Sequence, residues 1–310
     1  MKPKVVVICG PTASGKTALS IELAKKINGE IISADSMQIY KDMNIGAAKP
    51  TKEEMQGIKH YLIDFISPET RYSVADFKQQ AQEAIKEIIE KGKIPIIVGG
   101  TGLYINSLIY GIEYAKTEFD DEYRRKLEKI CLEKGLEYLY NEAKIIDPEA
   151  MQKISANDKK RIMRVLEIYN ETGKNKTQQD KESRKEVKYD YHVFALNMER
   201  EILYDRINKR VDLMLEQGLV EEVKYILKKY KEFPTAMQGL GYKEVKYYLE
   251  SIITYEEMVE KIKMETRRYA KRLITWFKKN EQTIWLDALS EIKNNVDIII
   301  DNITEKDFNN

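Results

Sequence analysis

The chain has 310 residues, with 43% hydrophobic residues, 33% charged residues and a net charge of +1 at pH 7, as expected of a globular protein with one large domain or two modest ones. No apolar run is long enough to cross a membrane, and the two cysteines stand too far apart in sequence to indicate a disulfide framework or a zinc cluster. We therefore expect a reduced, cytoplasmic protein, and the net charge itself favours no particular partner.

Strand and helix patterns alternate in the first third of the chain. Short apolar runs predict strands at residues 4–9, 30–34, 61–65 and 94–98. Helical spacing of apolar residues lies between them, at 17–27 and 75–91. This alternation predicts an α/β fold with a parallel sheet.

The middle of the chain changes character. From residue 118 to 188 the pattern is helical, charged and poor in strand signals. Apolar runs at 191–197 and 283–287 then predict further strands. We therefore expect a core made of residues 1–117 and 189–310, with residues 118–188 forming a helical insertion domain.

Residues 10–17 match the pattern GxxxxGK[ST] in full, between a predicted strand and an amphipathic helix. In such a loop, backbone N–H groups surround phosphate oxygens and the helix N-terminus adds partial positive charge. Lys16 supplies a full charge, and the Thr17 hydroxyl is a ligand for Mg²⁺. The motif predicts diphosphate or triphosphate binding without specifying ATP, and a chance glycine turn is the alternative. The expected phosphate-binding residues are Gly10, Pro11, Thr12, Ala13, Ser14, Gly15, Lys16 and Thr17.

Asp35 follows the second predicted strand, at the sheet edge where open α/β sheets carry their ligand crevice. Its carboxylate would face the same crevice as Lys16, where it could accept a proton from a nucleophile or hold a metal ion. A helix N-cap is the alternative role for this residue. Ser36 and Gln38 are polar groups that could read a base edge, as glutamine does with adenine.

A second glycine-rich turn follows the fourth predicted strand. Gly99, Gly100 and Gly102 surround Thr101, which carries the only side-chain hydroxyl among them. The turn ends at the same sheet edge as the phosphate loop, and its glycines allow a ligand to approach the backbone closely. A tight strand-to-helix turn with no ligand is the alternative.

Basic residues gather in three places. Residues 261–279 interleave Lys and Arg with aromatic residues, which fits either nucleic-acid binding or a solvated helix with buried aromatic side chains. Residues 159–164 form a second basic patch, inside the predicted insertion. Arg206 and Arg210 are four residues apart on one predicted helix face, so they could hold a diphosphate together or remain surface charges.

The chain resembles the tRNA dimethylallyltransferase family in six segments that occur in family order. These are 10–17 (GPTASGKT), 34–40 (ADSMQIY), 99–105 (GGTGLYI), 200–223 (REILYDRINKRVDLMLEQGLVEEV), 236–244 (AMQGLGYKE) and 267–277 (RRYAKRLITWF). The resemblance covers nearly the whole chain, and the second and fifth segments are far more specific than the phosphate loop alone.

The resemblance implies a P-loop NTPase-like core with a helical insertion domain that contacts tRNA. It implies transfer of a dimethylallyl group from dimethylallyl diphosphate to the N6 amine of the adenosine 3′-adjacent to the anticodon, with Mg²⁺ as cofactor. Asp35 matches the general base and Thr101 a residue close to the reacting groups, and Arg210 is our choice for the diphosphate-binding arginine, ahead of Arg206. The expected tRNA-binding residues are Asp35, Ser36, Met37, Gln38, Thr101, Arg124, Lys160, Arg161 and Arg164. We expect a monomer whose partners are the donor and the anticodon stem-loop, with no membrane association.

The sequence departs from the family pattern at four positions. Lys160 stands where the family usually has Gln, Ala47 where it has Thr, Leu273 where it has Gln, and Tyr61 where it often has His. These changes leave the phosphate-binding loop and the base unaltered, and they concern the details of tRNA contact and the activity or substrate range.

Three other functions share parts of these motifs. A small-molecule P-loop kinase would bind ATP, but it does not explain ADSMQIY or the basic insertion. A transferase acting on free adenine nucleotides would need no RNA-binding insertion. A non-catalytic RNA-binding protein would retain its activity without Asp35.

Overall fold

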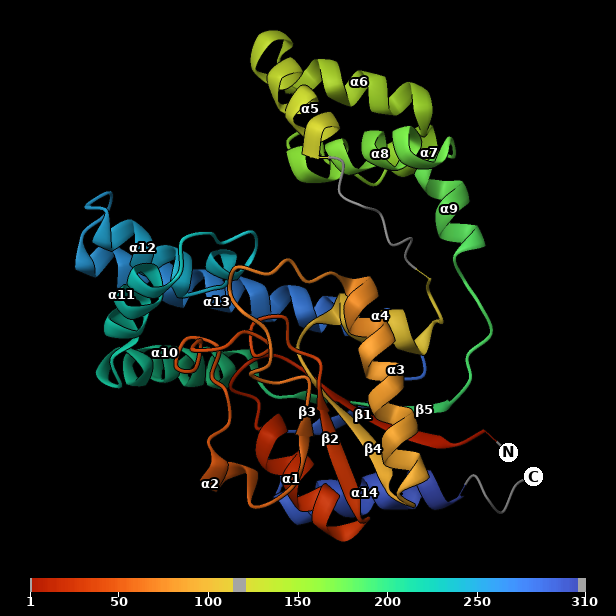
Figure 1. The fold of residues 1–310 in the computed structure, drawn as a ribbon. Helices are drawn as coiled ribbons and strands as arrows, with labels where there is room; N and C mark the ends of the chain where they lie inside the picture. The colour runs from red at the N-terminus through yellow and green to blue at the C-terminus, as the bar shows by residue number, and fades with distance from the viewer. Residues whose placement is uncertain (1, 114–120, 306–310) are drawn as a thin grey trace. The chain divides into compact units, whose positions relative to one another are not determined.

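A computed structural model describes residues 2–113 and 121–305 of the chain (Figure 1). The contacts divide the chain into two compact units, which we call unit 1 (Met1–Ile109 with Lys188–Asn310) and unit 2 (Tyr110–Val187). The domain boundary expected at residue 118 lies outside the described residues. Within the described part of the chain, no helix combines the length and the apolar character needed to cross a membrane.

Unit 1 is built on a parallel sheet. Its strands within the described residues are β1 (Lys4–Cys9), β2 (Gly29–Ser33), β3 (His60–Tyr61), β4 (Ile94–Gly99), β5 (Asp190–Asn197) and β6 (Ile284–Asp287). They lie in the order β3-β2-β4-β1-β5-β6, and every neighbouring pair is parallel. This arrangement confirms the α/β fold predicted from the strand and helix alternation. It also places the phosphate loop after a central strand, where the crevice of an open α/β sheet forms.

The third strand is shorter than its apolar run indicated. A strand was expected over residues 61–65, but β3 contains only His60 and Tyr61. Leu62 and Asp64 have φ angles of 57° and 56°, in the left-handed region, which a strand cannot pass through. The N–H of Phe65 donates instead to the carbonyl of Ile39 at 3.0 Å, so this segment packs beside the loop that follows β2.

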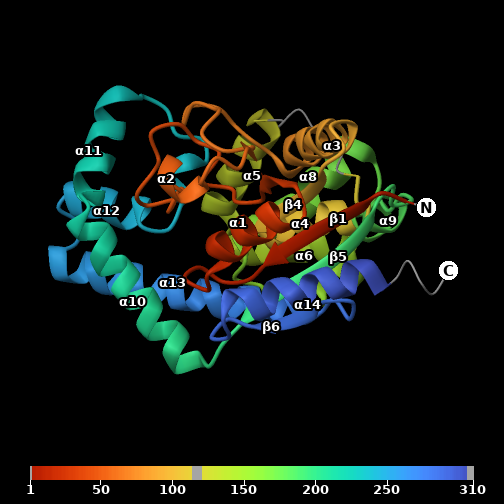
Figure 2. The same cartoon turned by 90° about the horizontal axis from the view of Figure 1, so that it is seen from below.

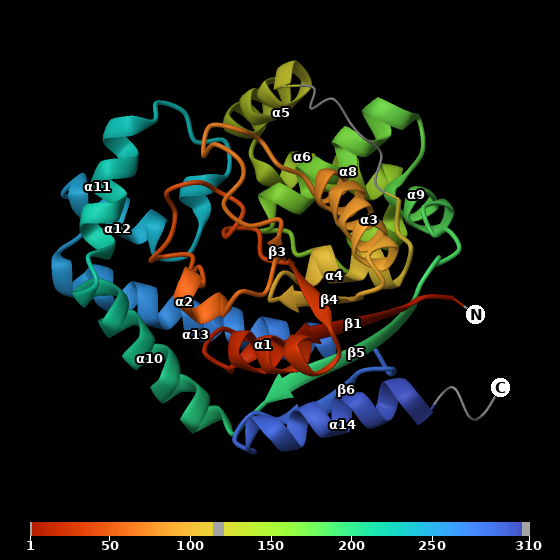
Figure 3. The ribbon, with the colours of Figure 1, turned by 60° about the horizontal axis from the view of Figure 1, so that its bottom comes forward.

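Helices cover both faces of the sheet. The helices of unit 1 within the described residues are α1 (Lys16–Lys26), α2 (Lys52–Met55), α3 (Val74–Glu90), α4 (Gly102–Ile109), α10 (Arg200–Glu216), α11 (Leu219–Lys229), α12 (Tyr242–Leu249), α13 (Tyr255–Phe277) and α14 (Ile292–Glu305), with a short 3₁₀ turn at Ala236–Gln238. Figure 3 shows α1 and α14 in front of the sheet and α3 and α4 behind it.

The side chains of β1 alternate between two cores, as the period of a strand requires. Val5 and Val7 pack with Phe77 of α3 and with residues of α4 and the end of α13. Val6 and Ile8 pack with residues of α1 and α14. Because both faces of β1 are buried, its sequence is continuously apolar rather than alternating.

A third core joins α10, α11, α12 and α13 to the segment after β2. Tyr40 and Met43 from that segment are buried against Tyr242 of α12 and Leu219 of α11. Figure 2 shows α10, α11 and α12 grouped together on one side of unit 1. This core therefore connects C-terminal helices to a loop that begins at the carboxyl end of a central strand.

Unit 2 consists of α5 (Asp121–Lys134), α6 (Leu136–Ile146), α7 (Pro148–Met151), α8 (Lys159–Thr172) and α9 (Lys176–Glu182). It has its own apolar core, which includes Leu139 and Ala143 of α6 and Ile162 and Val165 of α8. Its regular elements are helices throughout these described residues, which matches the helical pattern of the sequence.

Candidate active site

The phosphate loop joins β1 to α1, and its backbone has a positive φ angle at three residues. The φ angles are 142° at Gly10, 62° at Ala13 and 91° at Gly15. Gly15 is the N-cap of α1 and supplies no capping side chain, so the N–H groups of the first helical turn remain available to an anion. The hydroxyl of Ser14 donates to the carbonyl of Pro11 at 2.8 Å and closes the loop from inside.

Two partly buried cations lie beside this loop, Lys16 and Arg210. The ammonium of Lys16 donates to the carbonyl of Pro11 at 2.6 Å. The pKa of Lys16 is lowered to about 8, first by burial and then by the positive charge of Arg210, while Asp35 acts in the opposite direction. Burial also lowers the pKa of Arg210, against the influence of Glu54 and Asp35. Two cations that are desolvated and repel each other favour a bound anion.

Arg210 reaches the loop from α10. Among the residues that the structure describes, no carboxylate forms a direct ion pair with it. Arg206, one helical turn earlier, lines the same cavity, but it is not among the charges that shift the pKa of Lys16. The structure thus brings both arginines to the phosphate loop and places Arg210 in the closer electrostatic contact with Lys16.

Asp35 stands at the start of a tight turn after β2. Its Oδ1 accepts hydrogen bonds from the N–H of Met37 at 2.8 Å and the N–H of Gln38 at 3.3 Å. These bonds hold the carboxylate in one orientation. Within the described residues no group donates to Oδ2, so this oxygen remains available to accept a proton.

The glycine-rich turn after β4 packs directly on the Asp35 turn. A Cβ atom on Gly99 would lie 2.2 Å from the carbonyl oxygen of Ala34, so only glycine fits there. The N–H of Thr101 donates to that same carbonyl at 3.1 Å. In return, Oγ1 of Thr101 accepts from the N–H of Ser36 at 3.0 Å. Thr101 therefore supports the turn that carries Asp35.

One cavity of about 1110 Å³ joins these groups. Lys16, Asp35 and Arg210 all line it, together with the phosphate-loop residues from Thr12 to Thr17. Ser36, Met37 and Thr101 do not line the cavity. Ser36 and Met37 belong to the Asp35 turn, and Thr101 is hydrogen-bonded to it. The anion-binding loop and the carboxylate therefore open into a shared space, as their positions after β1 and β2 predicted.

Gln38 lines the cavity, but its amide group is engaged elsewhere. Its Nε2 donates to the carbonyls of Ala47 at 3.3 Å and Ala48 at 3.2 Å. Its Oε1 accepts from the hydroxyl of Ser33 at 3.0 Å. In this conformation the side chain connects the end of β2 to the segment at residues 47–48, rather than presenting its amide to the cavity.

The four basic residues expected to contact tRNA in unit 2 fall into two pairs. Arg124 and Arg164 both bind the buried carboxylate of Glu167, at 2.7 Å and 3.5 Å. Lys160 and Arg161 lie in the exposed first turn of α8. The first pair is thus held in place by a shared anion, and the second pair faces solvent.

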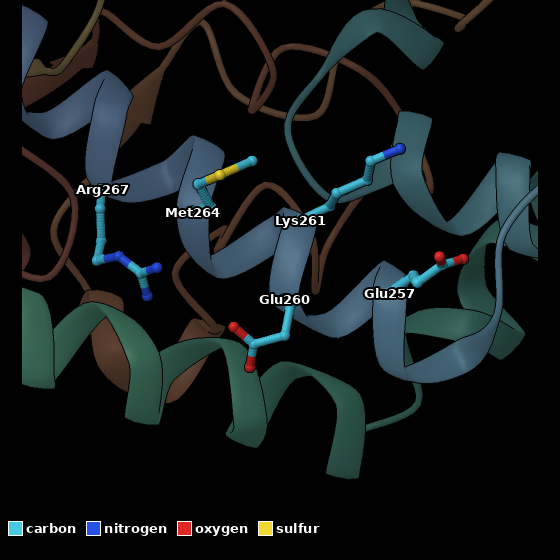
Figure 4. Close-up of a pocket in the computed structure, with 5 residues that line it drawn as sticks. All are labelled: Glu257, Glu260, Lys261, Met264 and Arg267. Atoms are coloured by element: carbon cyan, nitrogen blue, oxygen red, sulfur yellow. The ribbon is translucent and has the colours of Figure 1, made fainter.

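The basic stretch at residues 261–279 falls mostly in α13. Ala270, Leu273 and Phe277 are buried, whereas several basic residues lie on the outer face. A shallow pocket of about 310 Å³ lies along the helix, lined by Glu257, Glu260, Lys261, Met264 and Arg267 (Figure 4). The acidic residues in it offset its positive charge, so this pocket has no strong preference for an anion.

Sequence reasoning missed Tyr269 of α13, which lines the main cavity. Its hydroxyl donates to the carbonyl of Gly100 at 3.2 Å. Two family departures, Ala47 and Leu273, line the same cavity and make its wall more apolar. The RRYAKR segment places Tyr269 among basic residues in a predicted helix, but its periodicity could not show that this tyrosine faces the sheet edge.

The residues present fit Mg²⁺ only as an ion shared with a phosphate ligand. Within residues 2–113 and 121–305, no group of three or more His, Cys, Asp or Glu side chains is arranged to hold a metal ion. Mg²⁺ keeps several waters and binds through one or two protein groups plus phosphate oxygens. Thr17 and Asp35 line the cavity and could supply those groups.

The family model described as IPP transferase matches residues 38–280. A "tRNA dimethylallyltransferase" of Acetivibrio thermocellus is 55% identical over 285 residues, which cover 91% of this chain and 91% of that protein. One of Bacillus cereus (strain AH187) is 48% identical over 287 residues, covering 93% of this chain and 90% of that protein.

Solved structures agree in fold. A tRNA isopentenylpyrophosphate transferase from Bacillus halodurans has a TM-score of 0.74 and 41% identity, covering 98% of this chain and 97% of that chain. A eukaryotic dimethylallyltransferase acting on tRNA has a TM-score of 0.81 and 32% identity, covering 98% of this chain and 80% of that chain. The sequence and structure comparisons therefore select the same family.

Proposed function

The chain belongs to the IPP transferase family, and from this premise we infer that it is a tRNA dimethylallyltransferase. It transfers a dimethylallyl group from dimethylallyl diphosphate to the N6 amine of the adenosine 3′-adjacent to the anticodon and releases diphosphate. The observation that carries this function is the cavity into which both Lys16 and Asp35 open. This transfer requires a group that binds the diphosphate and a base that accepts the proton of the amine, both facing the same cavity.

The chemistry follows from the charges around that cavity. The bond between the allylic carbon and the diphosphate oxygen breaks, and its electron pair leaves with the diphosphate. Lys16 and Arg210 offset the negative charge that develops there. A bond forms from that carbon to the adenine N6, which loses a proton to Asp35.

Mg²⁺ fits this site when the donor supplies phosphate oxygens. We assign the Thr17 hydroxyl as its protein ligand, with Asp35 within the same cavity. When bound, the ion would neutralise charge on the diphosphate and improve it as a leaving group. Lys16 and the N-terminus of α1 orient the diphosphate through their own hydrogen bonds, whether or not the ion contributes.

The acceptor base must leave its stack in the anticodon loop to reach the cavity. Extrusion of a base costs a few kcal/mol, and contacts in the pocket have to recover this cost. We propose that unit 2 acts as an insertion domain that binds the anticodon stem-loop through Arg124, Lys160, Arg161 and Arg164. We expect the enzyme to work as a monomer in the cytoplasm.

Mass spectrometry of the product tests this function. The purified chain is incubated with dimethylallyl diphosphate, Mg²⁺ and an unmodified anticodon stem-loop RNA, and the digested nucleosides are analysed. We expect an adenosine that is heavier by one dimethylallyl group in place of a hydrogen. A parallel reaction with AMP should leave AMP unchanged, and product from AMP alone would assign the chain to the free-nucleotide transferases.

The base is tested in the same assay with Asp35→Ala. We expect turnover to fall by about 100-fold or more, because a positioned base contributes this much to proton transfer, with little change in RNA binding. Glu83→Ala, an exposed carboxylate on α3, is the control and should keep full turnover. Full turnover by Asp35→Ala would refute the assignment of Asp35 as base.

A further inference from the structure

The carboxylate of Glu222 on α11 binds a loop that is distant in the sequence. Its Oε2 accepts from the N–H of Asn44 at 2.9 Å and of Ile45 at 2.8 Å. Its Oε1 accepts from the N–H of Gly46 at 3.1 Å. Hydrogen bonds from backbone amides to an ionised group are among the stronger ones in proteins. Three consecutive amides are thus held by one side chain from another element.

Tyr242 of α12 completes this attachment. Its hydroxyl donates to Oε1 of Glu222 at 2.8 Å and accepts from the N–H of Ala47 at 3.1 Å. Its ring is fully buried against the loop, and a Cβ atom on Gly46 would lie 2.6 Å from ring carbons. Glycine is therefore required at position 46, and two side chains together bind four successive amides.

The same loop is bound from its other side by the turn that carries the base. Gln38 donates its amide to the carbonyls of Ala47 and Ala48, while its own N–H binds Asp35. A continuous set of hydrogen bonds therefore runs from Glu222 through residues 44–48 to Gln38 and then to Asp35. Because the loop also lines the cavity, its position affects both the wall and the base.

We propose that Glu222 is a positioning residue for the transfer reaction. It holds residues 44–48 against Gln38, and in this way it fixes the turn on which the Asp35 carboxylate stands. Gln38 acts as the link between the loop and the base. This inference rests on the proposed function, because it is the orientation of Asp35 toward the acceptor amine that Glu222 maintains.

Glu222→Gln tests this role, because it replaces one acceptor oxygen with an NH₂ group that faces backbone N–H donors. We expect kcat to fall between about 10-fold and 100-fold, since a misplaced catalytic group costs this much. The KM for dimethylallyl diphosphate should change less than about twofold, because the phosphate loop makes no contact with Glu222. A purely structural loss would instead lower the amount of active protein and leave the kcat of the folded fraction unchanged.

Glu221→Gln is the matched control. Glu221 is the neighbouring residue on α11, and its exposed carboxylate pairs with Lys224 of the same helix at 2.7 Å. The charge change is identical, but no loop contact is lost, so kcat should stay at the wild-type value. Equal kcat values for Glu222→Gln and Glu221→Gln would overturn the proposal.

Tyr242→Phe keeps the buried ring and removes only the hydroxyl, so it preserves the test if Glu222→Gln does not fold. We expect the same selective fall in kcat, with a smaller magnitude, and a double variant that is less impaired than the product of the two effects. Wild-type kcat in a folded Tyr242→Phe protein would contradict the proposed set of hydrogen bonds.

Hydrogen exchange gives a readout that is independent of activity. In Glu222→Gln, amides in residues 34–48 should exchange at least about 10-fold faster, while those of α1 stay unchanged. Unchanged exchange in residues 34–48 would refute the coupling. An inactive wild-type chain would refute the proposed function, whereas an active wild type with an equally active Glu222→Gln would refute the positioning role alone.

Discussion

Lys16 lines the cavity, and its pKa lies close to the physiological range. Burial lowers its pKa to about 8, with Arg210 contributing and Asp35 opposing. A bound diphosphate would favour the ammonium form and raise this pKa. The free protein therefore has a neutral Lys16 above about pH 8, and the donor complex has a charged one.

We predict that donor binding takes up a proton through Lys16 at alkaline pH. Below about pH 7 the lysine is already protonated in the free protein, so uptake by Lys16 should be close to zero. Near pH 9 it should approach one proton per site, because the free protein is mostly neutral there and the complex is charged. Titration calorimetry in two buffers of different ionisation enthalpy measures this number.

Lys16→Arg is the control for this measurement, because an arginine stays charged across the same range. Protons that the donor itself takes up appear in both proteins, so the difference between them isolates Lys16. An equal proton uptake by the two proteins at pH 9 would show that the lysine is already charged without a ligand.

At the level of elements, Asp147 joins two short helices of unit 2. It is buried, and it caps α7 by accepting from the N–H of Ala150 at 2.9 Å. It also accepts from the N–H and the hydroxyl of Thr177 in α9, at 2.7 and 2.8 Å. Burial alone would raise the pKa of Asp147, but these hydrogen bonds outweigh it and hold the pKa below its ordinary value.

We predict that Asp147→Ala lowers the free energy of unfolding of unit 2 by about 1–3 kcal/mol, because it removes a cap and leaves buried donors unsatisfied. Since the pKa is lowered in the fold, the stabilisation is fully present above the ordinary carboxyl pKa and is lost as the pH falls through the lowered one. The difference between wild type and variant should therefore shrink in acid. Chemical denaturation followed by circular dichroism at several pH values measures it.

Asp158→Ala serves as the comparison, since Asp158 caps α8 through the N–H of Arg161 at 3.1 Å but is partly exposed. It should cost less than Asp147→Ala, because water can satisfy the groups it leaves. An equal cost for both variants would mean that the contact between α7 and α9 contributes nothing.

The two units of the molecule carry basic residues in different environments. Unit 1 holds Lys16 and Arg210 partly buried beside the phosphate loop, whereas unit 2 exposes Lys160 and Arg161 on α8. Partly buried cations that line a cavity suit a small anion that enters it, and exposed cations suit the extended backbone of an RNA. The two substrates should accordingly respond differently to salt and to substitution.

We predict that the double variant Lys160→Ala/Arg161→Ala weakens tRNA binding and leaves donor binding unchanged. The slope of log K against log salt should become shallower by about 1–2, because each lost phosphate contact reduces it by somewhat less than one. Filter binding of tRNA at several salt concentrations measures the slope.

The matched control is Lys129→Ala/Lys144→Ala, which removes two exposed charges from α5 and α6 of the same unit. If α8 forms the tRNA contact, the control should retain the wild-type slope. If the control has a slope as shallow as that of the α8 variant, the change in slope comes from the loss of net charge and not from a contact made by α8.

Local patterns in the sequence were sufficient for the phosphate loop and for most of the strands. Residues 10–17 combine fixed glycine positions with a buried strand and a helix, and each of these features depends on near neighbours in the chain. The third strand was predicted too long because left-handed residues, Leu62 and Asp64, carry no distinctive side-chain signal.

The wall of the cavity, by contrast, is set by contacts between distant segments. Glu222 binds the N–H of Asn44 across 178 residues, and Arg210 reaches Lys16 from a helix that follows the insertion. No spacing in the sequence reveals the partner of Glu222, and the spacing of Arg206 and Arg210 left open whether they bind a diphosphate or remain surface charges. Such contacts form only when α10 and α11 pack on the loop after β2. The sequence therefore identified which chemical groups are present, and the packing of the C-terminal helices determined which of them meet.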